Sequence, residues 1–485
     1  MRYILLKSSV PILLSTALLG GCGLLMQKPV EQPPVHVAQS WEVKTSQSDI
    51  SITTAEQLLD QFKDPQLNQL YKYALVGNYD FSQQAAQTDR AAAALGIDSA
   101  ALWPELNLIL DSDRSGGEDT TNTSSHSLLG RISWEIDLWG RLRDVRDASE
   151  LDWEAEVADY QAARLSLAAS LSKAWFDYQA AVRQEELSRE NQVTIEIIVK
   201  LVNSRFRRGL ATLLELRLAR TNLASAKSDL ILAKENLVTR NNALKKLLGQ
   251  KAADLTVPVK SSLSNNLNSV PAGLPVEILR RRPDLVAAEK RYRSSVLVWQ
   301  ATEKSLLPGL SITATGGQVD SKFADLVDDS SVTAWSLSGQ LLAPIFNAGR
   351  ISAQVDRREA LTREELSKYG EVLFNAFLEV NEALESEQLI EERVKAQGEV
   401  LVEAQATEKL ALRDYGNGLT DLDTLLDAQR DAISAERNLV SAEVSRIKNR
   451  VDLLLALGGS FEMNRKESPY NILGVVEDAA KKVLD

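Results

Sequence analysis

The sequence predicts a mainly α-helical protein with a smaller membrane β-domain, assembled from two tandem copies of one unit. Three observations lead to this prediction. The two halves of the chain repeat each other at a fixed spacing, each half holds a very long stretch without proline, and each half holds two segments in which apolar and polar residues alternate. We therefore expect each unit to be a β-hairpin followed by a long helical hairpin.

The N-terminus has the pattern of a lipoprotein signal. A basic start and a short apolar stretch lead to small residues directly before Cys22, which is typical of a secretory signal peptide. We expect residues 1–21 to be removed and Cys22 to become the lipidated first residue of the mature protein. An uncleaved membrane anchor is the alternative, but the apolar stretch is short for a bilayer span. Gly23 stands where an Asp would retain a lipoprotein at the inner membrane, which favours the outer membrane, and residues 22–50 are expected to form a proline-spaced tether.

Two segments of each unit have the period of two that is typical of strands. They are residues about 105–112 and 126–137, joined by a polar loop, and residues about 309–317 and 332–345. The alternation fits either a soluble sheet with one solvated face or a sheet with one face in lipid. Lipid does not tolerate an open sheet edge, so four membrane strands would have to be completed by other copies. Two copies would give eight strands around a filled interior, whereas three would give twelve strands with room for a lumen.

The stretches that follow the strands predict helical hairpins at residues about 141–248 and about 350–457. They are rich in Ala, Leu, Glu, Gln and Arg and contain no proline. A first helix of roughly 65 residues would be about 100 Å long. The returning helix is expected to begin after a turn at Gly209 or Gly418, since glycine suits the end of a helix.

The two units keep the same length through their helical parts. Gly140 and Gly349 are 209 positions apart, and this separation is kept to the ends of the hairpins. Packed helices hold their length, whereas surface loops vary. Pro104 and Pro308 are only 204 positions apart, so the segment between this proline and the glycine at the hairpin start is five residues longer in the second unit, as a surface loop could be. The units are expected at residues 51–250 and 276–459, with a linker at 251–275 and a C-terminal tail at 460–485.

Composition argues against several classes of function. The net charge of -12 disfavours nucleic acid as a partner, because phosphate binding needs clustered Lys and Arg. One cysteine and two histidines make a zinc or di-iron site difficult to assemble. The sequence also contains no phosphate-binding glycine loop and no nucleophile motif. We therefore expect no catalytic site, no metal and no cofactor other than the lipid on Cys22.

The returning helix of the second hairpin carries charges that the first one lacks. Asp423, Asp427 and Arg430 are spaced four and three residues apart, so they share one helix face. This difference predicts that the second hairpin lines a central axis while the first braces it from outside. The corresponding residues of the first hairpin are Leu214, Leu218 and Thr221.

Five motifs resemble signatures of the outer membrane efflux proteins, the TolC-like channels, in particular their lipidated branch. They are "WEIDLWGRLRD", "LPVEILRRRPDLVAAEKR", "LLPGLSITATGG", "APIFNAGRI" and "YGNGLTDLDTLLDAQR". The resemblance extends from about Ser40 to about Gly459 and keeps the order of the motifs. It implies a homotrimer, with a 12-stranded β-barrel in the outer membrane continued by a 12-helix α-barrel across the periplasm.

The resemblance also implies a function and partners. The channel would pass small molecules to the exterior as part of a tripartite efflux pump, together with a periplasmic adaptor protein and an inner-membrane efflux transporter. An outer membrane duct for protein secretion is the nearest alternative. A periplasmic coiled-coil adaptor or scaffold is less suitable, because it gives no reason for two pairs of strands. The exported substrate and the partner pump are not specified by the sequence.

Two groups of site residues follow from the resemblance. The segment around Asp427 corresponds to the periplasmic constriction of the family, with Arg430 at the end of its motif and Asp423 one turn away. We expect acidic rings that disfavour anions and an arginine that holds neighbouring helices closed; an ordinary solvated Asp–Arg pair is the alternative. The hairpin tips are expected to dock the adaptor, although their glycines also serve the turns themselves. The docking candidates are Arg205, Gly209, Leu210, Tyr415, Gly418 and Leu419.

Overall fold

The structure, a computed structural model, describes residues 54–117, 120–249, 282–327 and 331–458. Cys22 and the predicted signal peptide, tether, linker and tail lie outside the described residues.

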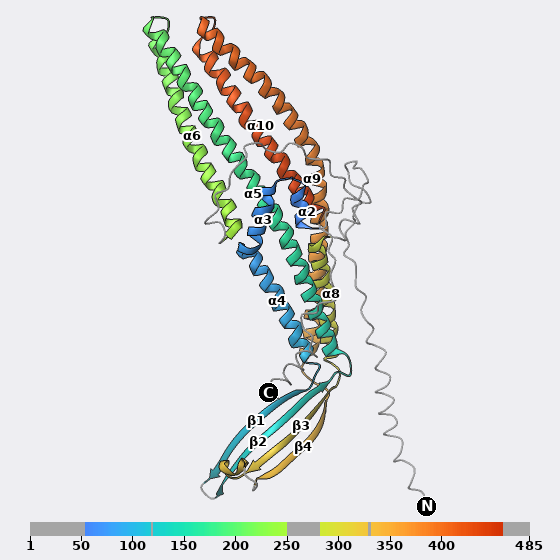
Figure 1. The fold of residues 1–485 in the computed structure, drawn as a ribbon. Coiled ribbons are helices and arrows are strands. Elements are labelled where there is room, and N and C mark those ends of the chain that lie inside the picture. Colours follow the sequence, from blue (N-terminus) through green and yellow to red (C-terminus); the bar gives the residue numbers. More distant parts are fainter. Residues whose placement is uncertain (1–53, 118–119, 250–281, 328–330, 459–485) are drawn as a thin grey trace, which may run out of the picture.

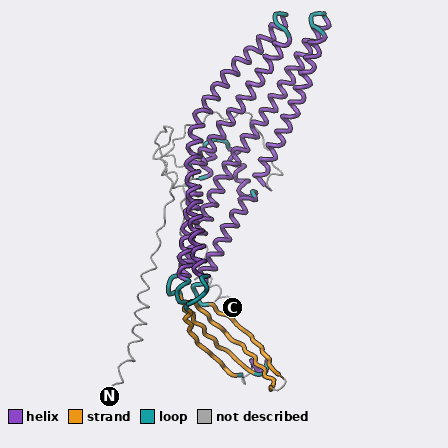
Figure 2. Tube along the Cα trace, turned by 180° about the vertical axis from the view of Figure 1, so that it is seen from behind, coloured by secondary structure: helices purple, strands orange, loops and turns teal. Residues whose placement is uncertain are grey.

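Two long helical hairpins dominate the fold and lie side by side, with a β-sheet at the end opposite their tips (Figure 1). The first hairpin consists of α5 (Arg141–Arg207) and α6 (Leu213–Leu248), and the second of α9 (Arg350–Asn417) and α10 (Leu422–Ala456). Figure 2 shows the same division into a helical rod and a sheet from behind. The prediction of two tandem units with long hairpins is confirmed. Among the described residues, no helix is both long enough and apolar enough to cross a membrane.

Both hairpins reverse at a glycine in the left-handed region, with φ of 72° at Gly209 and 78° at Gly418. Residues with a Cβ rarely adopt this conformation. Each returning helix then begins at a side-chain cap. Thr212 accepts a hydrogen bond from the main-chain N–H of Glu215 at 3.2 Å, and Asp421 accepts one from that of Thr424 at 2.8 Å.

A shorter helix continues each returning helix toward the sheet: α4 (Tyr79–Ala100) follows the line of α6, and α8 (Pro283–Lys304) follows that of α10. Where α6 meets α4, the Asn78 side chain donates to the Leu247 carbonyl at 2.9 Å. Where α10 meets α8, the Arg282 guanidinium donates to the Ala456 carbonyl, also at 2.9 Å.

These two junctions are equivalent in the two units. Asn78 and Arg282 are 204 positions apart, and Leu247 and Ala456 are 209 positions apart, the two separations that relate the units. α6 with α4, and α10 with α8, therefore each form one long, interrupted helical column, which we call a stave. Two further short helices, α2 (Ala55–Asp60) and α3 (Pro65–Gly77), pack on α5 near this level and bury their apolar side chains around Trp175.

The helices form a single curved layer with two open borders. Near the tips the packing order is α6, α5, α10, α9, and near the sheet it is α4, α5, α8, α9. α6 and α4 therefore form one border along the whole rod, and α9 forms the other. We call these the first and the second border.

The four strands of both units form one antiparallel sheet in the order β1 (Glu105–Gly117), β2 (Thr120–Ile136), β3 (Gly309–Asp320) and β4 (Val332–Leu342). A 3-10 turn, η3 (Phe323–Val327), lies beyond the far end of β3. β1 continues the first border and β4 continues the second, because they adjoin α4 and α9 in the chain.

Two strand boundaries differ from the prediction. The expected polar loop between the first two strands is largely strand, since β1 extends to Gly117 and β2 begins at Thr120. Its Ser and Thr side chains suit a strand with two polar faces, so polarity alone was a poor guide to a loop. The last strand was expected to reach residue 345 but ends at Leu342, because Pro344 has no N–H to donate to a ladder.

Candidate functional site

One face of the sheet consists of large apolar side chains that are exposed in the single chain. The strand register places Leu106, Ile132, Ala314 and Leu337 in one row across the four strands. The exposed fraction of Trp335 on this face is 80%, far above what a soluble sheet usually leaves open. The other large exposed apolar residues on this face are Leu106, Leu108, Leu110, Ile132, Trp134, Leu337 and Leu341.

The opposite face of the sheet is mainly polar. Asn107, Arg131, Thr315 and Ser336 form the neighbouring row, and the Thr315 and Ser336 hydroxyls lie 2.7 Å apart. The sheet is therefore amphipathic across its thickness. Its outer strands β1 and β4 each pair on one side only within the described chain, so both edges present unpaired N–H and C=O groups.

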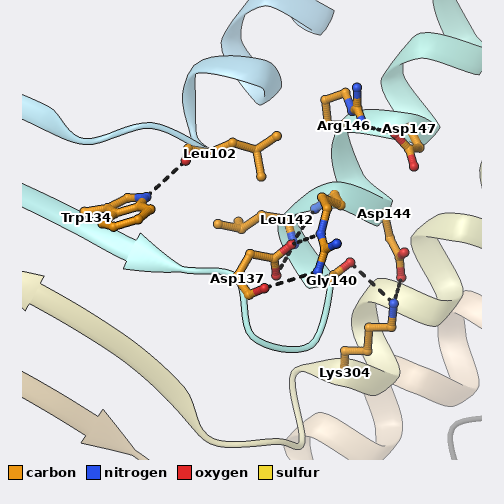
Figure 3. A network of polar contacts seen from close by, with 10 residues as sticks. Leu102, Trp134, Asp137, Gly140, Leu142, Asp144, Arg146, Asp147 and Lys304 are labelled. Carbon is orange, nitrogen blue, oxygen red and sulfur yellow. Dashed lines mark hydrogen bonds and ion pairs between the residues drawn. The ribbon is translucent and has the colours of Figure 1, made fainter.

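A polar network fixes the sheet to the helical rod in the first unit (Figure 3). The Asp137 carboxylate accepts hydrogen bonds from the main-chain N–H groups of Leu142 and Arg143, both at 3.1 Å, at the start of α5. Lys304, at the end of α8, forms an ion pair with Asp144 at 2.5 Å. These contacts join β2, α5 and α8 at one point.

The corresponding joint of the second unit is built differently. Gly349 begins α9 in the left-handed region with φ of 81°, as Gly140 does for α5 with φ of 75°. Phe346 occupies the position equivalent to Asp137, and its exposed fraction is 89%, while that of Ile345 is 93%. The second unit therefore places two uncovered apolar side chains beside the open edge of β4.

At the tips, Arg205 of the first hairpin holds the end of the second one. Its guanidinium donates to the main-chain carbonyls of Tyr415 at 2.9 Å and Gly416 at 3.2 Å. Its Cζ also lies 4.8 Å from the centre of the Tyr415 ring, a cation–π distance. We call this group of contacts the tip clasp. It connects residues that are 210 positions apart in the sequence.

Tyr415 is at the centre of the tip clasp and is only 1% exposed. Its hydroxyl has no hydrogen-bond partner among the described residues. Burial raises the pKa of this hydroxyl, and the nearby Glu215 carboxylate raises it further, while Arg205 opposes the shift. The ring, rather than the hydroxyl, is therefore the part of Tyr415 that contributes contacts.

The predicted docking residues fall into two groups. Leu210 and Leu419 point outward at the two turns, with exposed fractions of 60% and 75%. Gly209 has open space around it. Arg205 and Tyr415, in contrast, face each other in the tip clasp and are not presented for docking in this state. This contact could not be predicted, because the sequence does not specify which side of each helix faces the other hairpin.

The charged face of α10 is exposed in the single chain. Asp427 and Arg430 form an ion pair within the helix, with side chains that are 64% and 66% exposed. Asp423 lies one turn nearer the tip on the same side and is also exposed. Leu214, the counterpart of Asp423, is 68% exposed, whereas Leu218, the counterpart of Asp427, is half-buried against the apolar cluster around Leu216 and Tyr415.

The structure adds three carboxylates that the sequence analysis missed. A groove of about 610 Å³ between α9 and α10 is lined by Glu399, Glu403 and Asp431. Asp431 follows Asp427 by four residues and continues its acidic line. The spacing of Asp431 was readable from the sequence, but the two glutamates join it only through the packing of the hairpin.

A comparison with protein families places most of the chain in one of them. The model of a family described as "Outer membrane efflux protein" matches residues 70–250 and 274–459. The match is in two parts that correspond to the two units.

Individual proteins are similar over nearly their whole length. The probable efflux pump outer membrane protein TtgC of Pseudomonas putida is 29% identical over 468 residues, which cover 94% of this chain and 96% of TtgC. The crystal structure of the Campylobacter jejuni CmeC outer membrane channel has a TM-score of 0.82 and 25% identity, covering 92% of this chain and 97% of that one. The open state of the Neisseria gonorrhoeae MtrE outer membrane channel has a TM-score of 0.76 and 26% identity, covering 90% and 98%.

Proposed function

The chain belongs to the outer membrane efflux protein family, and from this premise we propose that three copies of it join to form one continuous conduit. The protein is the outer membrane channel of an efflux pump, in which the sheet lies in the outer membrane and the helical rod extends into the periplasm. The trimer, the gate, the docking surface and the lipid anchor are the finer parts of the proposal.

The two open borders carry the proposal of a closed assembly. The first border runs through α6, α4 and β1, and the second through α9 and β4. If the second border of each chain packed against the first border of the next chain, this one type of contact would complete both the sheet and the helical wall. Rotational symmetry closes such a head-to-tail contact into a ring, and closure removes the sheet edges that lipid does not tolerate.

Ring size follows from the number of strands. Two copies would give eight strands, whose interior is filled by side chains, whereas three give twelve strands and leave a lumen. The apolar face with Leu108 and Trp335 would then contact lipid, and the polar face with Arg131 and Thr315 would line the water-filled interior. The same ring would hold twelve helical staves in the periplasm.

We propose that the tips form the closed end of this conduit. The tip clasp holds the second hairpin against the first in each chain. On α10, Asp423 and Asp427 would each form a ring of three carboxylates around the axis. Carboxylates about 6 Å apart repel each other by about 3 kcal/mol per pair at an effective dielectric near 20, so these rings favour cations, and Arg430 offsets part of the charge.

The partners of the tips are a periplasmic adaptor protein and, through it, an inner-membrane efflux transporter. Leu210 and Leu419 are the exposed apolar side chains at the turns, and they are suited to a hydrophobic contact with the adaptor. The lipid on Cys22 would provide a second attachment to the outer membrane. A duct for secreted proteins is the alternative, and its relatives would be expected among secretion systems, whereas TtgC is described as an efflux pump protein.

The proposal is tested by the mass and conductance of the protein after extraction in mild detergent. Native mass spectrometry is expected to give three chains per particle, and the particles are expected to form water-filled pores in planar bilayers. A stable monomer, or a trimer that never conducts under any voltage or with any tip variant, would contradict the conduit.

A further inference from the structure

We propose that the two borders recognise each other by opposite charge, so that a second copy of this chain is selected at the helical wall by electrostatics as well as by shape. This inference rests on the proposed trimer and concerns how its neighbours are chosen.

The two border helices have opposite charge excesses. α6 carries seven Arg and Lys against three Asp and Glu. The part of α9 at the same level of the rod, residues 370–417 on the opposite border, carries four Arg and Lys against eleven Asp and Glu. The inner helix α10 is nearly balanced, with five basic and six acidic residues. The excess charge is therefore located where the chain has no neighbour of its own.

Several charges of the inner helices form ion pairs within the chain. Lys448 of α10 pairs with Asp177 of α5 at 3.2 Å, and Arg189 pairs with Glu185 along α5 at 2.7 Å. On α6, Arg240 is also used in this way, at 3.5 Å from Asp177.

Most border charges, in contrast, form no ion pair with another described residue. On α6 the exposed cations of this kind are Arg217, Arg220, Lys227, Lys234, Lys245 and Lys246. On α9 the exposed carboxylates of this kind are Glu371, Glu382, Glu385, Glu392, Glu399 and Glu403. Glu399 and Glu403 also line the groove between α9 and α10. Glu385 and Glu392 accept only a neutral amide hydrogen bond, from Asn381 and Gln388 respectively.

The unpaired charges of the two borders occur at matching heights. Lys227 and Lys234 follow Gly209 by 18 and 25 residues, while Glu399 and Glu392 precede Gly418 by 19 and 26 residues. The two turns are held together by the tip clasp, and a rotation about the axis leaves heights unchanged. The opposite charges of neighbouring copies therefore lie within about one helical rise, roughly 1.5 Å, of the same level.

Apolar side chains occupy the intervals between these charges. Ile231 and Val238 on α6 are 67% and 59% exposed, and Leu389 and Val402 on α9 are 65% and 64% exposed. Val238 and Leu389 are each 29 residues from their turn glycine. An apolar strip with flanking opposite charges is the arrangement by which paired helices select partner and register.

The test reverses charge on one border at a time. Lys227→Glu with Lys234→Glu makes both borders acidic, and Glu392→Lys with Glu399→Lys makes both basic. We expect each pair to reduce the trimer fraction of the detergent-extracted protein by about tenfold or more in about 0.1 M salt. Trimer should partly return in about 1 M salt, where the screening length falls to about 3 Å.

Combining the four substitutions restores opposite charges on the two borders and is expected to restore the trimer. Lys63→Glu with Lys72→Glu is the matched control for the α6 pair, because both lysines are exposed outside the border helices and the change in net charge is the same as for Lys227→Glu with Lys234→Glu. Co-expression of the two single-border variants should rescue only partly, since a ring of three cannot alternate two kinds of chain without one like-charged contact.

Two outcomes would overturn the inference. In the first, the single-border variants form as much trimer in low salt as the wild type does. In the second, the variant with all four substitutions assembles as poorly as the single-border variants while the control assembles normally. Neither outcome would contradict the trimer of the wild-type protein. A wild-type protein that is monomeric at every salt concentration would instead refute the proposed conduit.

Discussion

Removal of the Arg205 side chain is the most direct perturbation of the closed tip. In Arg205→Ala the main-chain carbonyls of Tyr415 and Gly416 lose their donor, and the Tyr415 ring loses the guanidinium 4.8 Å from its centre. The backbone of both hairpins is otherwise unaffected, because the turn at Gly209 is closed by its own main-chain hydrogen bonds, such as that from the Leu210 N–H to the Arg205 carbonyl at 2.9 Å.

The size of the effect follows from these contacts. Hydrogen bonds to a charged group contribute about 1.5–3 kcal/mol when buried, and a cation–π contact contributes about 0.5–1 kcal/mol at an exposed site. Arg205 is only half-buried, so we take about 2 kcal/mol per chain for the whole tip clasp. Loss of this amount shifts the balance between closed and open tips by about thirtyfold in each chain.

The assay is single-channel recording of the purified protein in planar bilayers. Arg205→Ala is expected to raise the open probability, and Arg205→Lys to give a smaller rise, because an ammonium cannot reach both carbonyls with the same geometry. Arg208→Ala is the control: it removes an arginine from the same tip whose Nε donates only to Ser204 of its own helix, at 3.3 Å. If Arg205→Ala assembles normally and opens no more often than Arg208→Ala, the tip clasp does not hold the tips closed.

Four further predictions follow from the structure. Tyr415→Phe should leave gating unchanged, since the hydroxyl has no partner, and an open probability as high as that of Arg205→Ala would show that the hydroxyl matters. Asp423→Asn with Asp427→Asn should abolish cation preference in reversal-potential measurements, and unchanged selectivity would place both residues outside the narrow path. Asp421→Ala should speed amide hydrogen exchange in the first turn of α10 at neutral pH. Hydrogen bonds from Thr424 lower the pKa of Asp421, so its stabilisation is present above the ordinary value of 3.8 and is lost as the pH falls through the lowered value; a difference from wild type that persists at lower pH would contradict this origin. Cys22→Ser should abolish labelling with radioactive palmitate, and a variant that is still labelled would exclude Cys22 as the lipidated residue.

The sequence was most informative where one physical requirement determined the residues. The starts of the two longest helices, directly after Gly140 and Gly349, could be predicted to within a residue. At both positions the glycine is followed by a long stretch of helix-forming composition without proline. The polar stretch after Asp111 was predicted wrongly for the opposite reason. Ser, Thr and Gly are common in loops, and the period of two disappears when both faces of a strand are polar.

The arrangement of side chains at the tips could not be predicted in the same way. Arg205 and Tyr415 both occur in turn motifs that suggested exposure, yet they face each other across 210 positions of sequence. Glu399 joins Asp431 in one groove only because α9 packs on α10 in a particular register. Such pairs depend on tertiary packing, which local patterns do not encode.

The charged residues occur on α10 and not at the equivalent positions of α6, which is consistent with different positions of the two hairpins in the proposed ring. Leu214 is 68% exposed in the single chain, and its burial against a neighbouring copy would contribute about 1.5–3 kcal/mol, whereas an aspartate there would lose its hydration. Asp423 at the equivalent position of α10 suits a surface that stays wet. The first hairpin therefore needs apolar residues where it packs against a neighbouring chain, and the second hairpin needs carboxylates where it faces water. If the second hairpin carried the same apolar face, the three inner helices would pack against each other and close the channel permanently, without a gate that can reopen.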